Sequence, residues 1–139
     1  RSNVMRGKMF AIHSSSSDRE LRLLARSGDE FRVELLGREI NVACEVSAYT
    51  DSKGLLALFE KLAAHARPWQ GSESWSSLEG EFNLIATCST SGHVHFLVEL
   101  RGQPGASEEW HASAGITSEL GQLQSIAAAA RSFFDNARA

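Results

Sequence analysis

The chain has 139 residues, of which 42% are hydrophobic and 22% are charged, the balance of an ordinary globular domain. Its formal net charge is -3 and its Lys and Arg residues are scattered, so nothing indicates nucleic acid as a partner. It has no signal peptide and no apolar run of about 18 residues or more, which argues against a membrane span and favours a cytoplasmic protein. We interpret residues 1–5 as a disordered or vector-derived start and residues 6–139 as one α+β domain.

Alternation of apolar and polar residues predicts four strands in the first third of the chain. The alternating runs cover residues 9–13, 21–26, 31–35 and 39–48. The last run is the cleanest, because every second side chain from Ile40 onward is apolar. Each run predicts a strand with one buried face and one face in water.

Two segments change to the helical period and predict amphipathic helices. Apolar residues recur at intervals of three and four from Leu55 to Ala66, and again from Leu123 to Phe134. Pro68 ends the first helix, because proline has no N–H to donate and disfavours helical geometry at the preceding residue. Each helix has a single apolar stripe, so each is expected to lie on a sheet face or beside the other helix.

A second group of strands lies between the two helices. Alternation over residues 82–88, 93–100 and 109–116 predicts an antiparallel meander, which follows a polar connection over residues 69–80. The element order is therefore β-β-β-β-α-β-β-β-α, and both halves share a strands-then-helix plan. Segregated strands and helices favour an α+β fold with a mostly antiparallel sheet of about seven strands.

A row of polar side chains is predicted on the wet face of this meander. A tight turn between its first two strands places Asn83 opposite Glu99 and Ile85 opposite Leu97. The next connection then places His111 beside Glu99 or Leu97. We therefore predict a polar cluster of Asn83, Glu99 and His111, in which the Glu99 carboxylate orients the imidazole.

His93 and His95 extend this candidate cluster, because residues two apart on a strand point to the same face. One interpretation makes His111 a general base, but no motif supplies a Ser or Cys nucleophile. Another joins the three histidines around zinc, but zinc needs three or four ligands at roughly 2 Å and no fourth ligand is evident. We predict no catalytic residue, no metal and no cofactor. A small hydrolase or metal-binding protein remains the alternative function.

Four apolar or aromatic residues are candidates for contact with a partner. Trp69 and Trp75 stand in the polar connection, and tryptophan is enriched at binding hot spots. The alternative is that both rings pin this connection to the sheet or the helix. Ile85 and Leu97 fall on the polar phase of their strands, which indicates a face that is partly covered by a helix, by a partner or by a second copy of the chain.

The two cysteines, Cys44 and Cys88, both fall on the apolar phase of predicted strands. A buried free thiol is the interpretation we favour, because free cysteine is among the most buried residue types. No C-x-x-C motif indicates a metal site. A disulfide would need Cα atoms within about 7 Å, and the sequence leaves that open.

The second half of the chain carries short motifs that resemble small bacterial proteins of unknown function, some of them similar to immunity proteins that accompany bacterial toxins. The resemblance covers residues 69–134 and rests on Trp75, Leu78-Glu79-Gly80, Gly92-His93-Val94, Trp110, Gly121-Gln122-Leu123 and Phe133. It implies binding and no turnover. We therefore predict a non-enzymatic bacterial interaction domain whose partner is a protein, with a toxin as the candidate, or a second copy of itself.

Overall fold

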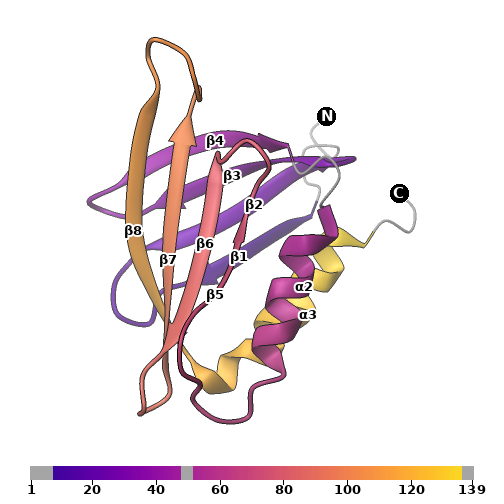
Figure 1. Ribbon diagram of the computed structural model, residues 1–139, viewed down its shortest axis with the longest axis vertical. Coiled ribbons are helices and arrows are strands. Elements are labelled where there is room, and N and C mark those ends of the chain that lie inside the picture. The colour runs from indigo at the N-terminus through magenta and orange to yellow at the C-terminus, as the bar shows by residue number, and fades with distance from the viewer. Residues whose placement is uncertain (1–7, 48–51, 136–139) are drawn as a thin grey trace.

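The computed structural model describes residues 8–47 and 52–135, so the first five residues lie outside the described part. Over the described residues the chain forms eight strands, two α-helices and one 3₁₀ turn (Figure 1). The strands of the first half are β1 (Met9–His13), β2 (Glu20–Ser27), β3 (Glu30–Leu36) and β4 (Asn41–Ser47), and helix α2 (Ser52–Ala63) follows them. The second half contains β5 (Glu73–Ser76), β6 (Phe82–Cys88), β7 (His93–Gly102), β8 (Trp110–Glu119), the turn η1 (Leu120–Gln122) and helix α3 (Leu123–Phe134).

The strands form two antiparallel four-stranded sheets, β1-β2-β3-β4 and β5-β6-β7-β8. The α+β class, the antiparallel pairing and both helices are therefore confirmed, whereas the single sheet of about seven strands is corrected to two sheets. Each half of the chain is a meander of four consecutive strands followed by a helix. The added strand is β5, which lies within the predicted polar connection and pairs with β6.

One core fills the space between the two sheets and the helix pair. The sheets pack face to face with their strands at a steep angle, and α2 and α3 lie side by side along one open side (Figure 1). Phe31 of β3 illustrates the packing, because its ring meets Phe82 of β6 at 6.5 Å and Phe133 and Phe134 of α3 at 6.3 and 5.9 Å between centroids. Residues from both halves of the chain therefore build the same core.

The two helices are short and amphipathic, as predicted. Each has 12 residues, and each buries one stripe, with Leu58, Phe59 and Leu62 among the buried residues of α2. Helix α2 ends at Ala63, three residues before the last residue of the predicted stripe, because the amides of Ala64 and His65 bond to carbonyls three positions back. No helix in the described part of the chain is long and apolar enough to cross a membrane.

The edge of β8 that has no neighbouring strand is covered by the loop between β1 and β2. The Ser15 amide donates to the Thr117 carbonyl at 2.9 Å, and the Thr117 amide donates to Ser14 Oγ at 3.2 Å. Further along, the Arg19 guanidinium donates to the Gly115 carbonyl at 3.0 Å. These bonds occupy backbone groups that an open edge strand would offer to another chain. The serine-rich loop therefore joins the two sheets instead of lying free in solvent.

Candidate functional site

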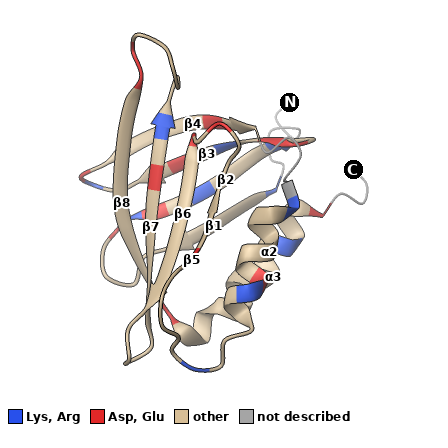
Figure 2. Cartoon of the chain, viewed as in Figure 1, with Lys and Arg blue, Asp and Glu red and all other residues tan. Residues whose placement is uncertain are grey.

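The outer faces of the two sheets differ in charge. On the β1–β4 sheet, Arg22 contacts Glu20 at 2.9 Å and Glu34 at 3.7 Å, and Arg32 contacts Glu34 at 2.9 Å and Glu45 at 3.4 Å. Figure 2 shows both acidic and basic segments on this sheet. The side chains form a ladder of ion pairs in which the charges are matched within the sheet. This face is solvated and offers few groups in need of a partner.

The outer face of the β5–β8 sheet is uncharged at its centre, with β6 free of charged residues (Figure 2). Ile85 of β6 lies opposite Leu97 of β7, and Leu97 lies opposite Gly115 of β8. All three are half-buried although they point away from the core. The predicted pairing of Ile85 with Leu97 is confirmed. The centre of this face is thus a small aliphatic patch flanked by serine, threonine and histidine side chains.

The predicted polar cluster is partly assembled at the upper end of this face. Asn83 and Glu99 are opposite each other, and Asn83 Nδ2 donates to Glu99 Oε1 at 3.4 Å. Both line a hollow of about 330 Å³, together with His111, Arg101 and Ser113. We call this the polar hollow; its remaining lining residues are Gly80, Leu100 and Ala112.

The predicted contact between Glu99 and His111 is wrong. Glu99 pairs with Ser113, and Arg101 is the residue opposite His111. The error is two positions, because the β7–β8 hairpin continues to a pair between Gly102 and Trp110, and Gly102 lies beyond residue 100, where the first of these strands was predicted to end. His111 therefore lies on the rim of the polar hollow but does not face Glu99.

Glu109 is the carboxylate that orients His111. Its Oε2 is 2.8 Å from His111 Nε2 and 3.3 Å from Arg101 Nε, and its Oε1 accepts the Gly105 amide at 2.8 Å. The Gly105 N–H, then His111 and the positive charge of Arg101, lower the pKa of Glu109 below its ordinary value. Sequence reasoning missed both Glu109 and Arg101. The signal for Arg101 was its position two residues after Glu99, on the same face of the strand.

His93 and His95 lie away from the polar hollow. His93 pairs with Glu119, with Nδ1 3.1 Å from Oε2, and it is eight positions along β7 from the pair Arg101–His111, or roughly 26 Å. The ring of His95 covers Gly115, where an added Cβ would come within 2.5 Å of Cε1. Among the described residues, no group of three or more His, Cys, Asp or Glu side chains could hold a metal ion. The three histidines do not form a common site.

The two tryptophans have different environments. Trp75 is only 8% exposed and packs edge-on against Phe82 at 5.9 Å, so its candidate role as a surface contact is corrected to a core role. Trp69 is half-buried and stacks on His65 at 4.5 Å between ring centroids. It also lines a hollow of about 540 Å³ beside Cys88. Trp69 remains accessible from that side.

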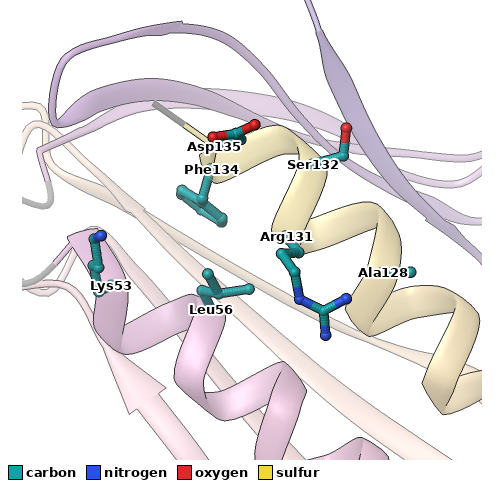
Figure 3. A pocket seen from close by; sticks show the side chains of 7 residues that line it. All are labelled: Lys53, Leu56, Ala128, Arg131, Ser132, Phe134 and Asp135. Atoms are coloured by element: carbon teal, nitrogen blue, oxygen red, sulfur yellow. The ribbon is translucent and has the colours of Figure 1, made fainter. Parts of the chain in front are cut away.

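A further hollow of about 570 Å³ lies between the helices (Figure 3). Phe134 and Leu56 are among its apolar lining residues, and Lys53 and Arg131 are its basic ones. Arg131 is already paired with Glu60 at 2.9 Å. Sequence reasoning did not single out this hollow, because Leu56 lies one position off the buried stripe and only the approach of α3 makes a concavity there.

The cysteines are far apart. Cys44 Sγ contacts the Glu81 carbonyl at 3.8 Å, whereas Cys88 is seven positions further along the chain through β6, roughly 23 Å away. Both are free thiols. Burial, then the negative charges of Glu81 and Glu45, raise the pKa of the Cys44 thiol to about 11.

These observations define a protein with two antiparallel sheets, one face closed by ion pairs and the other uncharged around a polar hollow. The chain belongs to a family of unknown function (DUF6228), whose model matches residues 12–137. Neither the curated proteins nor the solved structures contain a match to the chain.

Proposed function

We propose that this protein is a non-enzymatic interaction domain that binds a protein partner through the outer face of the β5–β8 sheet. The observation that carries the proposal is the difference in charge between the two outer faces. Charged side chains on the β1–β4 sheet are paired with one another, whereas Ile85 and Leu97 form a half-buried aliphatic patch on the other sheet. An aliphatic centre with a polar rim is the usual composition of a protein-binding surface.

The free energy gained by burying the aliphatic patch is too small to hold a partner without further contacts. Complete burial of an aliphatic side chain of this size contributes about 1.5–3 kcal/mol. Because Ile85 and Leu97 are already half-buried, completing their burial contributes roughly half of that value for each. Polar neighbours, including Thr87, His95 and Thr117, must therefore supply hydrogen bonds around the patch.

The partner class that we favour is a toxin encoded beside the gene for this chain, for which the domain would act as an immunity protein. The short motifs that resemble such proteins support this. If the protein self-associates, a second copy of the chain would occupy the same patch. An experiment must therefore distinguish the toxin from a second copy of the chain.

The test compares Leu97→Asp with the matched control Leu24→Asp. Leu24 is also half-buried on an outer face, but it belongs to the β1–β4 sheet. We expect the wild-type protein to co-purify stoichiometrically with a protein encoded next to its gene. Leu97→Asp should weaken that complex by about tenfold or more, because binding would bury an unpaired carboxylate. Leu24→Asp should leave the affinity unchanged.

Thermal unfolding of both variants checks that each retains the fold. Sedimentation of the wild-type protein then separates the two occupants. A dimer that Leu97→Asp dissociates would replace the toxin with a second copy of the chain. A complex that survives Leu97→Asp unchanged would refute the use of this face.

A further inference from the structure

Glu99 differs from the other half-buried carboxylates of the described chain, because it has no basic partner. The others each lie within 4.0 Å of a Lys, Arg or His nitrogen; they are Glu20, Glu34, Glu73, Glu109 and Glu119. The single hydrogen bond to the Glu99 carboxylate comes from Asn83, at 3.4 Å. A half-buried carboxylate with one long neutral bond retains acceptor capacity for a charged donor.

The side chains beside Glu99 add further acceptors. Asn83 and Ser113 are its register partners on the two neighbouring strands, so the three side chains form one row across β6, β7 and β8. Asn83 donates its Nδ2 to Glu99, so its Oδ1 can still accept a hydrogen bond from another donor. The row therefore presents a carboxylate between an amide oxygen and a hydroxyl, all on the wall of the polar hollow.

The basic groups of the polar hollow are already held elsewhere. Arg101 contacts Glu109 at 3.3 Å, and its Nη1 would lie 3.5 Å from a Cβ added at Gly80. His111 contacts the same Glu109 oxygen at 2.8 Å. Arg101 and Glu109 are therefore paired with each other, which leaves Glu99 as a carboxylate of the polar hollow with no basic group within 4.0 Å in the described part of the chain. The Glu99 carboxylate can therefore accept a cation that the chain itself does not supply.

We propose that Glu99 is the docking point for an arginine side chain of the protein partner, an inference that rests on the proposed function of this face. A guanidinium carries five N–H donors in a plane, which suits a row of three acceptors better than the compact ammonium of lysine does. The hollow of about 330 Å³ has room for on the order of ten water molecules at about 30 Å³ each, so the end of a side chain can enter it.

The position of the row also specifies what lies beside the arginine. Glu99 is two residues from Leu97 on the same face of β7, a separation of roughly 7 Å. A partner that fills both places must therefore present an arginine next to an aliphatic side chain. Such a surface combines the aliphatic anchor of the patch with one charged contact on its border.

The test uses N-acetyl-arginine amide as the probe, so that it does not depend on finding the partner. We expect saturable shifts of the Asn83 side-chain amide and the Ser113 backbone amide in ¹H–¹⁵N NMR spectra. Glu99→Gln should weaken the binding by about 10-fold or more, as expected for loss of a hydrogen bond to a charged group. Glu34→Gln is the matched control, because Glu34 is also half-buried on an outer face but is paired, and it should leave the probe affinity unchanged.

N-acetyl-lysine amide should bind more weakly than the arginine probe. Absence of a saturable shift in the wild-type protein, or equal binding by Glu99→Gln, would overturn the arginine site. If the probe binds as expected but no partner complex depends on Leu97, the proposed function fails while the cation site stands. If the complex depends on Leu97 but the probe does not bind, the arginine site fails while the proposed function stands.

Discussion

Replacing Phe31 with alanine tests whether the two halves of the chain unfold as one unit. Phe31 is 1% exposed and meets Phe82, Phe133 and Phe134 edge-on. Truncation of a buried phenylalanine costs about 3–5 kcal/mol. We take about 4 kcal/mol, because edge-to-face partners add to the ordinary burial contribution.

This loss converts to a large change in melting temperature. An unfolding entropy of about 2.1 cal/mol/K per residue over 139 residues amounts to about 0.29 kcal/mol/K, so Tm should fall by about 14 °C. The control Phe31→Leu retains most of the volume but loses the ring contacts, and it should cost about 1.5 kcal/mol, or about 5 °C.

The assay is thermal and urea unfolding followed by circular dichroism and by tryptophan fluorescence. Both probes should report one transition in the wild-type and in both variants, because Phe31 joins β3 of one half to β6 and α3 of the other. A decrease below about 2 kcal/mol for Phe31→Ala would contradict the central position of this ring. Two separate transitions would show that the halves unfold independently.

Two further predictions concern titratable groups. Because the pKa of the Cys44 thiol is raised to about 11 from 9.0, Cys44 should react with iodoacetamide at pH 8 roughly 100-fold more slowly than an ordinary free cysteine. Peptide mass spectrometry measures the rate of this reaction. A difference in rate below about tenfold would contradict the argument that burial raises the pKa. The depressed pKa of Glu109 means that this carboxylate stabilises the hairpin tip above its unfolded pKa, near 4.5, and ceases to do so as pH falls through the lower folded value. An NMR titration of the Glu109 side chain should give a midpoint below 4.5, and a midpoint at or above 4.5 would be inconsistent with its contacts to Gly105 and His111.

The part of the site that sequence reasoning located correctly depends on a short turn. Ser89 donates its amide to the His93 carbonyl at 2.9 Å, and Gly92 has a φ of 89° that closes the turn. A turn of this length leaves one register, with Cys88 opposite Val94, so the pairs further along β6 and β7 follow by counting.

The β7–β8 register could not be counted in the same way. The predicted connection began after the last apolar residue of the strand, but the ladder continues to Gly102 and Trp110. An added Cβ at Gly102 would overlap the Trp110 indole, so the glycine is what lets this ring lie across the hairpin. The pattern of hydrophobic residues does not record such a packing arrangement, and the predicted partner of Glu99 was therefore displaced by two residues.

Strand β5 and the separation into two sheets were also beyond local reasoning. Glu73–Ser76 is short, and Trp75 is its one large apolar residue. It becomes a strand because Trp75 packs on Phe82 and because β6 offers a free edge. Alternation along a strand shows which side is buried, but it does not show which strands share a sheet, since that depends on contacts between distant parts of the chain.

The loop that covers β8 has a consequence for biosynthesis. Ser15 precedes its partner Thr117 by 102 residues, so a ribosome that adds about 5–20 residues per second produces the loop roughly 5–20 s before the strand it will cover. The first sheet can pair its strands during that interval and hold the loop in place. The newly made β8 then has a neighbour of its own chain on each side, which limits the time in which nascent chains on one messenger could pair through that edge.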